Sequence, residues 1–273
     1  MKKKNYPSVL LIAILTFMVS CQTGEPWQPV FNGEDLSGWE TWVGPLEENG
    51  EPVGLNKDPK QVFSVTEVDG EKTIRISGEV NASLATIQEY ENYHLVMEFK
   101  WGEQVYSKRN SGLLYHSFGE YGEGLGVWMS GHELQLWTGN IGDSYRMGKS
   151  YCEIPMKQTS EGKYIYAKDA EMAPSIPDTE TRIVSKNGDN ENAIGEWNTV
   201  EIYCYGGTSV HMVNGNVNMV NYNSGKYFGE DNIEPLTKGK IQIQSEGGEL
   251  FIRTLKIQPI KEIPEDILPQ PEE

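Results

Sequence analysis

Cysteine and histidine are scarce in this sequence, which limits the chemistry it can support. The 273 residues include three cysteines and four histidines. So few cysteines exclude a disulfide-rich scaffold, and their spacing suits no metal site. Cys152 and Cys204 could pair in an oxidising compartment or stay as two buried free thiols, and the sequence leaves both states open.

Positive charge is scarce as well. Lys and Arg number 23 against 40 Asp and Glu, which gives a formal net charge of −17. The phosphate backbone of a nucleic acid would repel such a chain, so nucleic acid is not an expected partner. A neutral ligand such as a sugar is easier to accommodate.

Long apolar runs are missing except at the N-terminus, where residues 9–19 follow three lysines at positions 2–4. This run is too short to span a bilayer as a stable helix and is typical of a secretory signal over residues 1–20. Residues 18–21, Met-Val-Ser-Cys, resemble a bacterial lipobox, which implies that Cys21 is lipidated and becomes the first residue of the mature chain. The alternative is a plain signal peptide that happens to end near a cysteine.

The residues after Cys21 lack a long acidic run. This favours a lipid anchor in the bacterial envelope that faces the periplasm over export to the cell surface. Residues 21–29 would form a short tether, and the lipid would be the only attachment to the membrane. Loss of the three N-terminal lysines would take the formal charge from −17 to about −20.

Helical periodicity is also absent, whereas alternating and β-rich runs recur at residues 73–77, 94–101, 112–116 and 197–205. Asn214 and Gly215 lie between two such runs and predict a tight hairpin turn. Gly247 and Gly248 predict a second hairpin for the same reason. No repeat of about forty to fifty residues indicates a propeller. The prediction is an all-β, antiparallel, two-sheet β sandwich that forms a single domain over residues 30–260.

Two segments fall outside this pattern. Residues 159–192 are polar and weakly periodic, so we expect a long loop inserted between strands at the edge of a binding site. Residues 261–273 form an acidic, proline-rich tail that we expect to be disordered.

The run His-Glu-Leu-Gln-Leu-Trp at residues 132–137 holds the main candidate for chemistry. A strand here places Glu133, Gln135 and Trp137 on one face and the other three side chains on the opposite face. A carboxylate can move protons, an amide can bind hydroxyl groups, and an indole can stack on a sugar ring. The alternative is an ordinary half-exposed strand with a surface Glu and Gln.

An ordered set of motifs from about residue 27 to 258 resembles the bacterial 3-keto-disaccharide hydrolase family. That family is linked to 3-keto-glucoside 1,2-lyase and 3-keto-2-hydroxyglucal hydratase activity. The motifs are the segments at residues 31–39, 63–70, 90–100, 110–112 (Asn-Ser-Gly), 133–135 (Glu-Leu-Gln), 195–198, 214–215, 239–244 and 251–253. The resemblance implies a concanavalin-like jelly-roll sandwich with a sugar site on a concave sheet. It also implies a separate glycoside 3-oxidase or dehydrogenase that supplies the substrate.

The proton chemistry of a keto sugar selects the candidate residues. Removal of the C2 proton needs a base, a group that stabilises the enolate oxygen, and an acid for the leaving group. Glu133 and His116 are the predicted catalytic residues, and a structural role for His116 stays open. The predicted substrate-binding residues are Asn110, Gln135, Trp137, Tyr145 and Arg146.

The other candidate residues have separate assignments. Asp143 lies in the same loop as Tyr145, and Trp101 is a second candidate for stacking on a sugar. His132 is assigned to packing, and His94 and His211 to the sheet surface. A divalent metal could stabilise the enolate, but the sequence shows no ligand cluster, so no cofactor is assigned.

The sequence leaves three functions open. The first is cleavage of 3-keto-glycosides with Glu133 as the central residue. The second is a non-catalytic glycan-binding lipoprotein that uses the same concave face. The third is a conventional glucanase, which is less favoured because the Glu133 strand offers no second carboxylate nearby.

Overall fold

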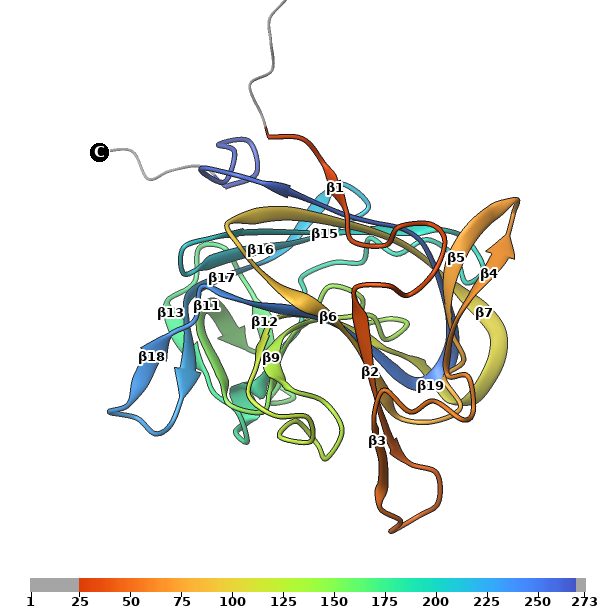
Figure 1. Ribbon diagram of the computed structural model, residues 1–273. Helices are drawn as coiled ribbons and strands as arrows, with labels where there is room; N and C mark the ends of the chain where they lie inside the picture. The colour runs from red at the N-terminus through yellow and green to blue at the C-terminus, as the bar shows by residue number, and fades with distance from the viewer. Residues whose placement is uncertain (1–24, 269–273) are drawn as a thin grey trace, which may run out of the picture.

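The computed structural model describes residues 25–268, which form two layers of antiparallel strands (Figure 1). The first layer, here called the back sheet, contains β4 (Phe63–Val68), β5 (Glu71–Ile76), β7 (Tyr93–Asn110), β15 (Asn198–Tyr205), β16 (Thr208–Val213), the start of β17 (Asn216–Tyr227), the end of β19 (Lys238–Pro259) and β1 (Gln28–Pro29). The second, here called the front sheet, contains β2 (Trp39–Pro45), β3 (Pro52–Leu55), β6 (Ala82–Glu91), β8 (Gly112–Phe118), β9 (Ser130–Gln135), β10 (Ser144–Met147), β14 (Ile183–Val184) and the start of β19.

The two sheets enclose the main hydrophobic core. Alternate residues of the front sheet, such as Leu113 and Leu134, point inward and meet Leu95 and Ile252 of the back sheet. This is the arrangement that period-two alternation dictates for a two-layer sandwich. The predicted all-β, concanavalin-like antiparallel sandwich is therefore confirmed.

The Asn214-Gly215 turn is confirmed as well. It joins β16 to β17, and both residues have the positive φ angles of a tight hairpin, 48° and 79°. The second predicted hairpin is wrong. Gly247 and Gly248 lie inside β19, a continuous strand of 22 residues that leaves the front sheet and enters the back sheet at these glycines. Gly247 has a positive φ, and the strand register shifts at these residues. β19 therefore bends sharply at a bulge here and does not form a hairpin turn.

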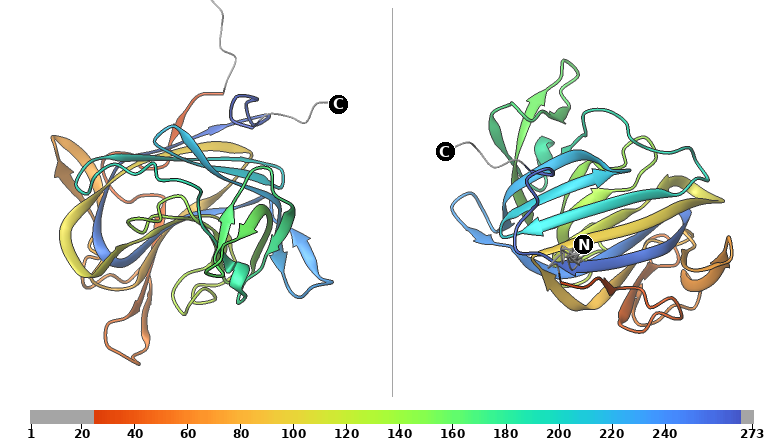
Figure 2. Two further views of the ribbon diagram at one scale, coloured as in Figure 1. Left: turned by 180° about the vertical axis from the view of Figure 1, so that it is seen from behind. Right: turned by 90° about the horizontal axis from the view of Figure 1, so that it is seen from above.

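Residues 159–192 do edge the front sheet, but they are more ordered than a plain loop. They include β12 (Tyr164–Tyr166), β13 (Met172–Ser175), the 3-10 turn η1 (Glu180–Arg182) and β14. With β11 (Ser150–Gln158), the end of β17 and β18 (Ile233–Pro235), β12 and β13 form a small side layer, visible beside the sandwich in both views of Figure 2. We call residues 159–192 the insertion.

The described part of the predicted tail, residues 261–268, is ordered, which corrects the expected disorder there; residues 269–273 lie outside the described residues. Ile263 is buried against Tyr203 and Val210, and Ile267 and Leu268 donate backbone hydrogen bonds to Pro264. These apolar side chains explain why the described part of the tail packs on the back sheet. Within residues 25–268 no helix is long and apolar enough to cross a membrane.

Candidate active site

A cavity of about 940 Å³ lies against the face of the front sheet that points away from the core. This volume is at the upper end of the roughly 300–1,000 Å³ typical of ligand sites, and it exceeds the needs of one sugar ring. Its walls come from the end of β7, from β9 and β10, from the bend of β19, from the loops before and after β9, and from the insertion. Its lining includes Lys108, Asn110, Leu125, Trp128, Glu133, Gln135, Trp137, Asn140, Asp143, Tyr145, Met147, Tyr164, Ile183, Gln244 and Glu246.

Glu133 lies at the centre of β9 and lines this cavity, while Leu134 points into the core. Its side chain is 2% exposed and makes no hydrogen bond to any residue in the described range 25–268. Burial raises the pKa of its carboxyl well above the usual value, the nearby Glu246 raises it further, and Arg146 opposes the shift. Glu133 is therefore a strong base when ionised.

Gly112 makes room for this carboxylate. A Cβ added to Gly112 would lie 2.3 Å from Glu133 Oε1 and 2.6 Å from Gln244 Oε1. The side chains of Glu133, from β9, and Gln244, from β19, thus close over the backbone of β8, which runs between them. This explains in physical terms why a glycine stands third in the Asn-Ser-Gly segment.

Glu246 is a second carboxylate in the cavity, and no motif in the sequence indicated it. It stands at the bulge of β19, beside Asn110 in strand register. Burial raises its pKa, whereas Lys108 and a hydrogen bond from Asn110 lower it. The residue was hidden because the following Gly-Gly pair was assigned to a turn.

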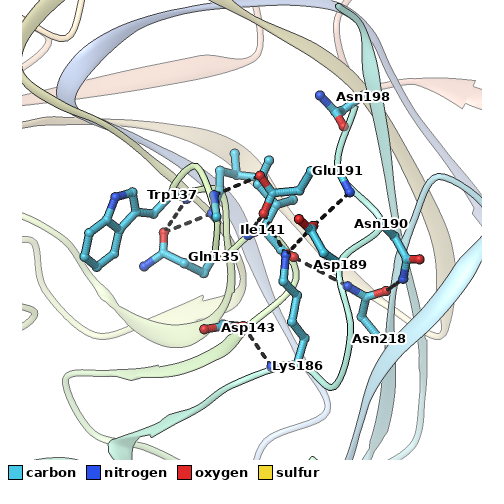
Figure 3. A network of polar contacts seen from close by, with 12 residues as sticks. Gln135, Trp137, Ile141, Asp143, Lys186, Asp189, Asn190, Glu191, Asn198 and Asn218 are labelled. Atoms are coloured by element: carbon cyan, nitrogen blue, oxygen red, sulfur yellow. Dashed lines mark hydrogen bonds and ion pairs between the residues drawn. The ribbon is translucent and has the colours of Figure 1, made fainter. Parts of the chain in front are cut away.

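Gln135, Asn110 and Gln244 bring side-chain amides to the same part of the cavity. Gln135 Oε1 accepts hydrogen bonds from the backbone N–H groups of Leu136 and Trp137, so its NH₂ group is directed to the ligand space (Figure 3). The side-chain oxygens of Asn110 and Gln244 are buried and have no partner within residues 25–268. Such unsatisfied groups are suited to binding the hydroxyls of a sugar.

Trp137 follows on the same face and is 41% exposed, with Lys108 Nζ 4.4 Å from its ring centroid. Its indole is exposed at the cavity, the position that the predicted stacking on a sugar ring requires. Trp101, the other candidate, is buried in the main core and does not line the cavity.

The insertion fixes the loop that follows Trp137. The Glu191 carboxylate accepts hydrogen bonds of 2.8 Å from the backbone N–H groups of both Gly139 and Ile141. Lys186 Nζ in turn lies 2.6 Å from Glu191 Oε1 (Figure 3). The insertion therefore sets the position of the loop as well as lining the cavity.

Asp143 ends this loop and is a third carboxylate in the cavity. Its Oδ1 accepts a hydrogen bond of 2.8 Å from the backbone N–H of Lys186 (Figure 3). Burial raises its pKa to about 6, although the hydrogen bonds and the Lys186 charge act in the opposite direction.

Tyr145 and Arg146 point to opposite sides of β10. Tyr145 lies beside Glu133 in strand register and lines the cavity, and burial raises its pKa to about 12. Arg146 was predicted to bind substrate, but its side chain is fully buried behind the sheet. There it donates hydrogen bonds to His132, Ser144 and Cys152. Alternation along β10 places it on the core side, which corrects its predicted contact with substrate.

His116, predicted to be catalytic, is not brought to the cavity. It sits at a bulge of β8 with a positive φ of 49°, and it lies outside the lining of the cavity. Its ring packs edge-on against Tyr93 and Tyr115, and burial lowers its pKa to about 3. The bulge turns this side chain into the interior, away from Glu133.

The other histidines divide between the core and the surface. His132 packs in the interior as expected, whereas His211 was expected on the sheet surface and is instead fully buried, hydrogen-bonded to Tyr115. His94 lies on the back sheet and pairs with Glu201.

The two cysteines in the described range, Cys152 and Cys204, are buried free thiols. Residues 25–268 contain no group of three or more His, Cys, Asp or Glu side chains arranged to hold a metal ion. Cys21, the predicted lipidation site, lies outside the described residues.

The fold and the cavity define a class of protein. A β sandwich that gathers carboxylates, amides and an exposed indole in one cleft has the groups that a carbohydrate-active protein uses to bind and act on a sugar. Residues 26–258 match the model of the 3-keto-alpha-glucoside-1,2-lyase-like domain, and the chain belongs to that family. The family resemblance noted in the sequence is thereby confirmed.

Solved structures with a similar chain path include two putative glycosyl hydrolases from Parabacteroides distasonis ATCC 8503. One is 21% identical with a TM-score of 0.47, covering 86% of this chain and 94% of its own. The other is 18% identical with a TM-score of 0.47, covering 86% and 100%. The carbohydrate-binding module CBM66 from Bacillus subtilis is 5% identical with a TM-score of 0.45, covering 81% and 95%. No curated protein matches the chain.

Proposed function

We propose that this protein cleaves glycosides oxidised at C3 by removing the C2 proton and expelling the C1 aglycone. The observation that carries the proposal is Glu133, a buried carboxylate with a raised pKa that faces a large cavity among side-chain amides. Proton transfer is most efficient when the pKa of the base lies near the working pH, and burial moves Glu133 in that direction.

The ketone at C3 explains why one base is enough for the first step. When the C2–H bond breaks, its electron pair delocalises into the carbonyl and forms an enolate. The ketone then re-forms, a C1=C2 double bond appears and the C1–O bond breaks. The aglycone oxygen takes up a proton, and water added across the double bond would complete a net hydrolysis.

The residues of the cavity supply each requirement. Glu133 takes the C2 proton, and the amide of Asn110 or Gln244 donates a hydrogen bond to the enolate oxygen. Tyr145 carries its proton at neutral pH, because its pKa of about 12 lies far above 7, and its hydroxyl can donate that proton to the leaving oxygen. Gln135 and Trp137 hold the sugar ring by hydrogen bonding and stacking.

A conventional glycoside hydrolase is the second candidate. The argument against it was the lack of a second carboxylate near Glu133 in the sequence, and the cavity brings Glu246 and Asp143 to its lining beside Glu133. The two reactions differ in their substrate, because only elimination needs the C3 ketone.

The test uses matched glucosides that are oxidised or unoxidised at C3. We expect aglycone release from the oxidised compound alone, a primary isotope effect on deuteration at C2, and a loss of activity of at least about 1,000-fold in Glu133→Gln. Release from the unoxidised glucoside without a C2 isotope effect would establish conventional hydrolysis instead. Saturable binding without turnover of either compound would establish a glycan-binding protein.

The cellular setting is part of the proposal. The proposal implies a separate oxidase or dehydrogenase that acts at C3, because the elimination needs a substrate that is already oxidised there. We also propose that Cys21 carries a lipid that anchors the protein in the bacterial envelope, facing the periplasm. Mass spectrometry of the purified native protein tests this, and an unmodified N-terminus at another residue would contradict it.

A further inference from the structure

The cavity differs in character on the two sides of Glu133. Along β9, Gln135 lies two residues beyond Glu133 and Gly131 lies two residues before it. Asp143, Asn140, Asn110 and Glu246 gather at the Gln135 side, so this side is rich in hydrogen-bonding groups. We call it the polar end.

At the other side, Met147 pairs with Gly131 and Tyr145 pairs with Glu133. Both side chains belong to one apolar cluster that also contains Leu114 and Trp128. Ile183 of the insertion pairs with Tyr145 across β10 and β14, and Leu125 lines a second, smaller cavity together with Tyr145 and Met147. We call this side the apolar end.

Two side chains of the apolar end are left uncovered. Leu125 is 61% exposed and Ile183 is 43% exposed, although both line a cavity. Leu125 also has a φ of +49°, a backbone conformation that a bulky residue adopts only when its surroundings impose it. Exposed apolar side chains that converge on one pocket indicate a ligand with an apolar surface.

We infer that the apolar end binds an uncharged apolar aglycone, an aryl or alkyl group in place of a second sugar. This rests on the proposed function, because Glu133 at the boundary between the two ends then faces the bond that links sugar to aglycone. A second sugar would bury hydroxyl groups against Met147, Leu125 and Ile183, which cannot form hydrogen bonds with them. A charged group would likewise lose its hydration against these apolar side chains without gaining a hydrogen bond.

The test compares 3-keto-glucosides that carry cyclohexyl or methyl as the aglycone. The two alcohols are similar leaving groups, so a difference in kcat/KM reports on binding of the aglycone in the transition state. We expect the cyclohexyl compound to be preferred at least about tenfold, because several CH₂ groups are buried.

Substitutions at the apolar end test whether these side chains cause the preference for the cyclohexyl compound. Leu125→Asn introduces a polar residue that tolerates a positive φ, and Ile183→Thr introduces a hydroxyl while keeping the β-branched shape. Each substitution should reduce the preference for the cyclohexyl compound at least about threefold. Ile87→Thr, at an exposed position outside the cavity, is the matched control and should leave it unchanged. Circular dichroism verifies that each variant is folded.

The binding of unoxidised cyclohexyl and methyl glucosides, measured by calorimetry, separates this inference from the proposed function. If neither keto compound is turned over but the cyclohexyl glucoside binds more tightly, the proposed function fails and the apolar end stands. If both keto compounds are turned over at similar kcat/KM, and the two glucosides bind equally, the apolar end does not hold the aglycone.

Discussion

At the residue scale, Gly112 is the position where the smallest change should have the largest effect on the site. A methyl group there would enter the space of the Glu133 and Gln244 side chains, at 2.3 and 2.6 Å from their oxygen atoms. We predict that Gly112→Ala lowers kcat by at least about 100-fold, because a displacement of about 1 Å is enough to misalign a catalytic group. Turnover of a 3-keto-glucoside measures the effect.

The control for this substitution is Gly207→Ala, where the nearest atom lies at 3.5 Å and the added methyl group fits. Far-UV circular dichroism should show both variants folded. If Gly112→Ala retained the rate of the parent protein, Glu133 would not need its present position, and its assignment as the base would fall.

Asp143 gives a prediction about stability and pH. Its folded-state pKa of about 6 exceeds the ordinary value of 3.8, so the folded protein holds a proton that the unfolded chain releases. Stability is therefore lost as the pH rises from about 4 through about 6. Asp143→Asn should raise the unfolding free energy at pH 7.5 by up to about 3 kcal/mol.

The gain should fade as the pH is lowered to 4, because the parent carboxyl is then protonated in the folded state and about half protonated in the unfolded chain. Urea unfolding of the two proteins at pH 4 and 7.5 measures it. Asp231→Asn, at an exposed position, serves as the control for a simple change of net charge. A gain of equal size at both pH values would mean that the Asp143 carboxyl is not desolvated.

At the element scale, regular strands could be predicted from the sequence and bulges could not. Alternation along residues 130–135 was enough to place Glu133 and Gln135 toward the ligand and Leu134 in the core. His116 and Glu246 were misplaced or missed because each stands at a break in strand register. A bulge reverses the facing of later side chains, and its position is set by neighbouring strands that are distant in sequence.

The insertion illustrates a second limit of the sequence. Its polar composition correctly indicated a segment at the edge of the site. Its function as a support could not be predicted, because the partners of Glu191 are backbone N–H groups about fifty residues away in the chain. Backbone donors carry no signature in the sequence.

The Glu191 contact leads to the third prediction. Glu191→Gln removes the charge that pairs with Lys186 and leaves a single oxygen to accept from the Gly139 and Ile141 N–H groups. The unfolding free energy should fall by about 1–3 kcal/mol, and hydrogen exchange at residues 139 and 141 should accelerate.

Glu79→Gln removes a partner of Lys60 in an exposed ion pair, and its cost should stay below about 1 kcal/mol. An equal effect of the two substitutions would contradict a specific anchoring contact at Glu191. A rise in KM in Glu191→Gln alone would connect this anchor with substrate binding.

At the scale of the whole molecule, the strands that run through both layers should make unfolding cooperative. The start of β19 pairs with β6 and β8 in the front sheet, and its end pairs with β5 and β7 in the back sheet. Neither sheet can keep its hydrogen bonds once β19 detaches. Damage to the back sheet should therefore destabilise the front sheet, and with it the cavity, to the same extent.

Ile252→Ala tests this coupling. Ile252 is fully buried in the back-sheet half of β19, so its truncation should cost about 2–5 kcal/mol. If the sandwich unfolds as one unit, the slowest-exchanging amides of β8 and β9 in the front sheet lose as much protection as those of β7 and β15 in the back sheet. Ile87→Ala, at an exposed position on β6, should leave protection in both sheets almost unchanged. Loss of protection confined to the back sheet would instead show that the active-site sheet is stable without its partner, and the shared strands would then not couple the two layers.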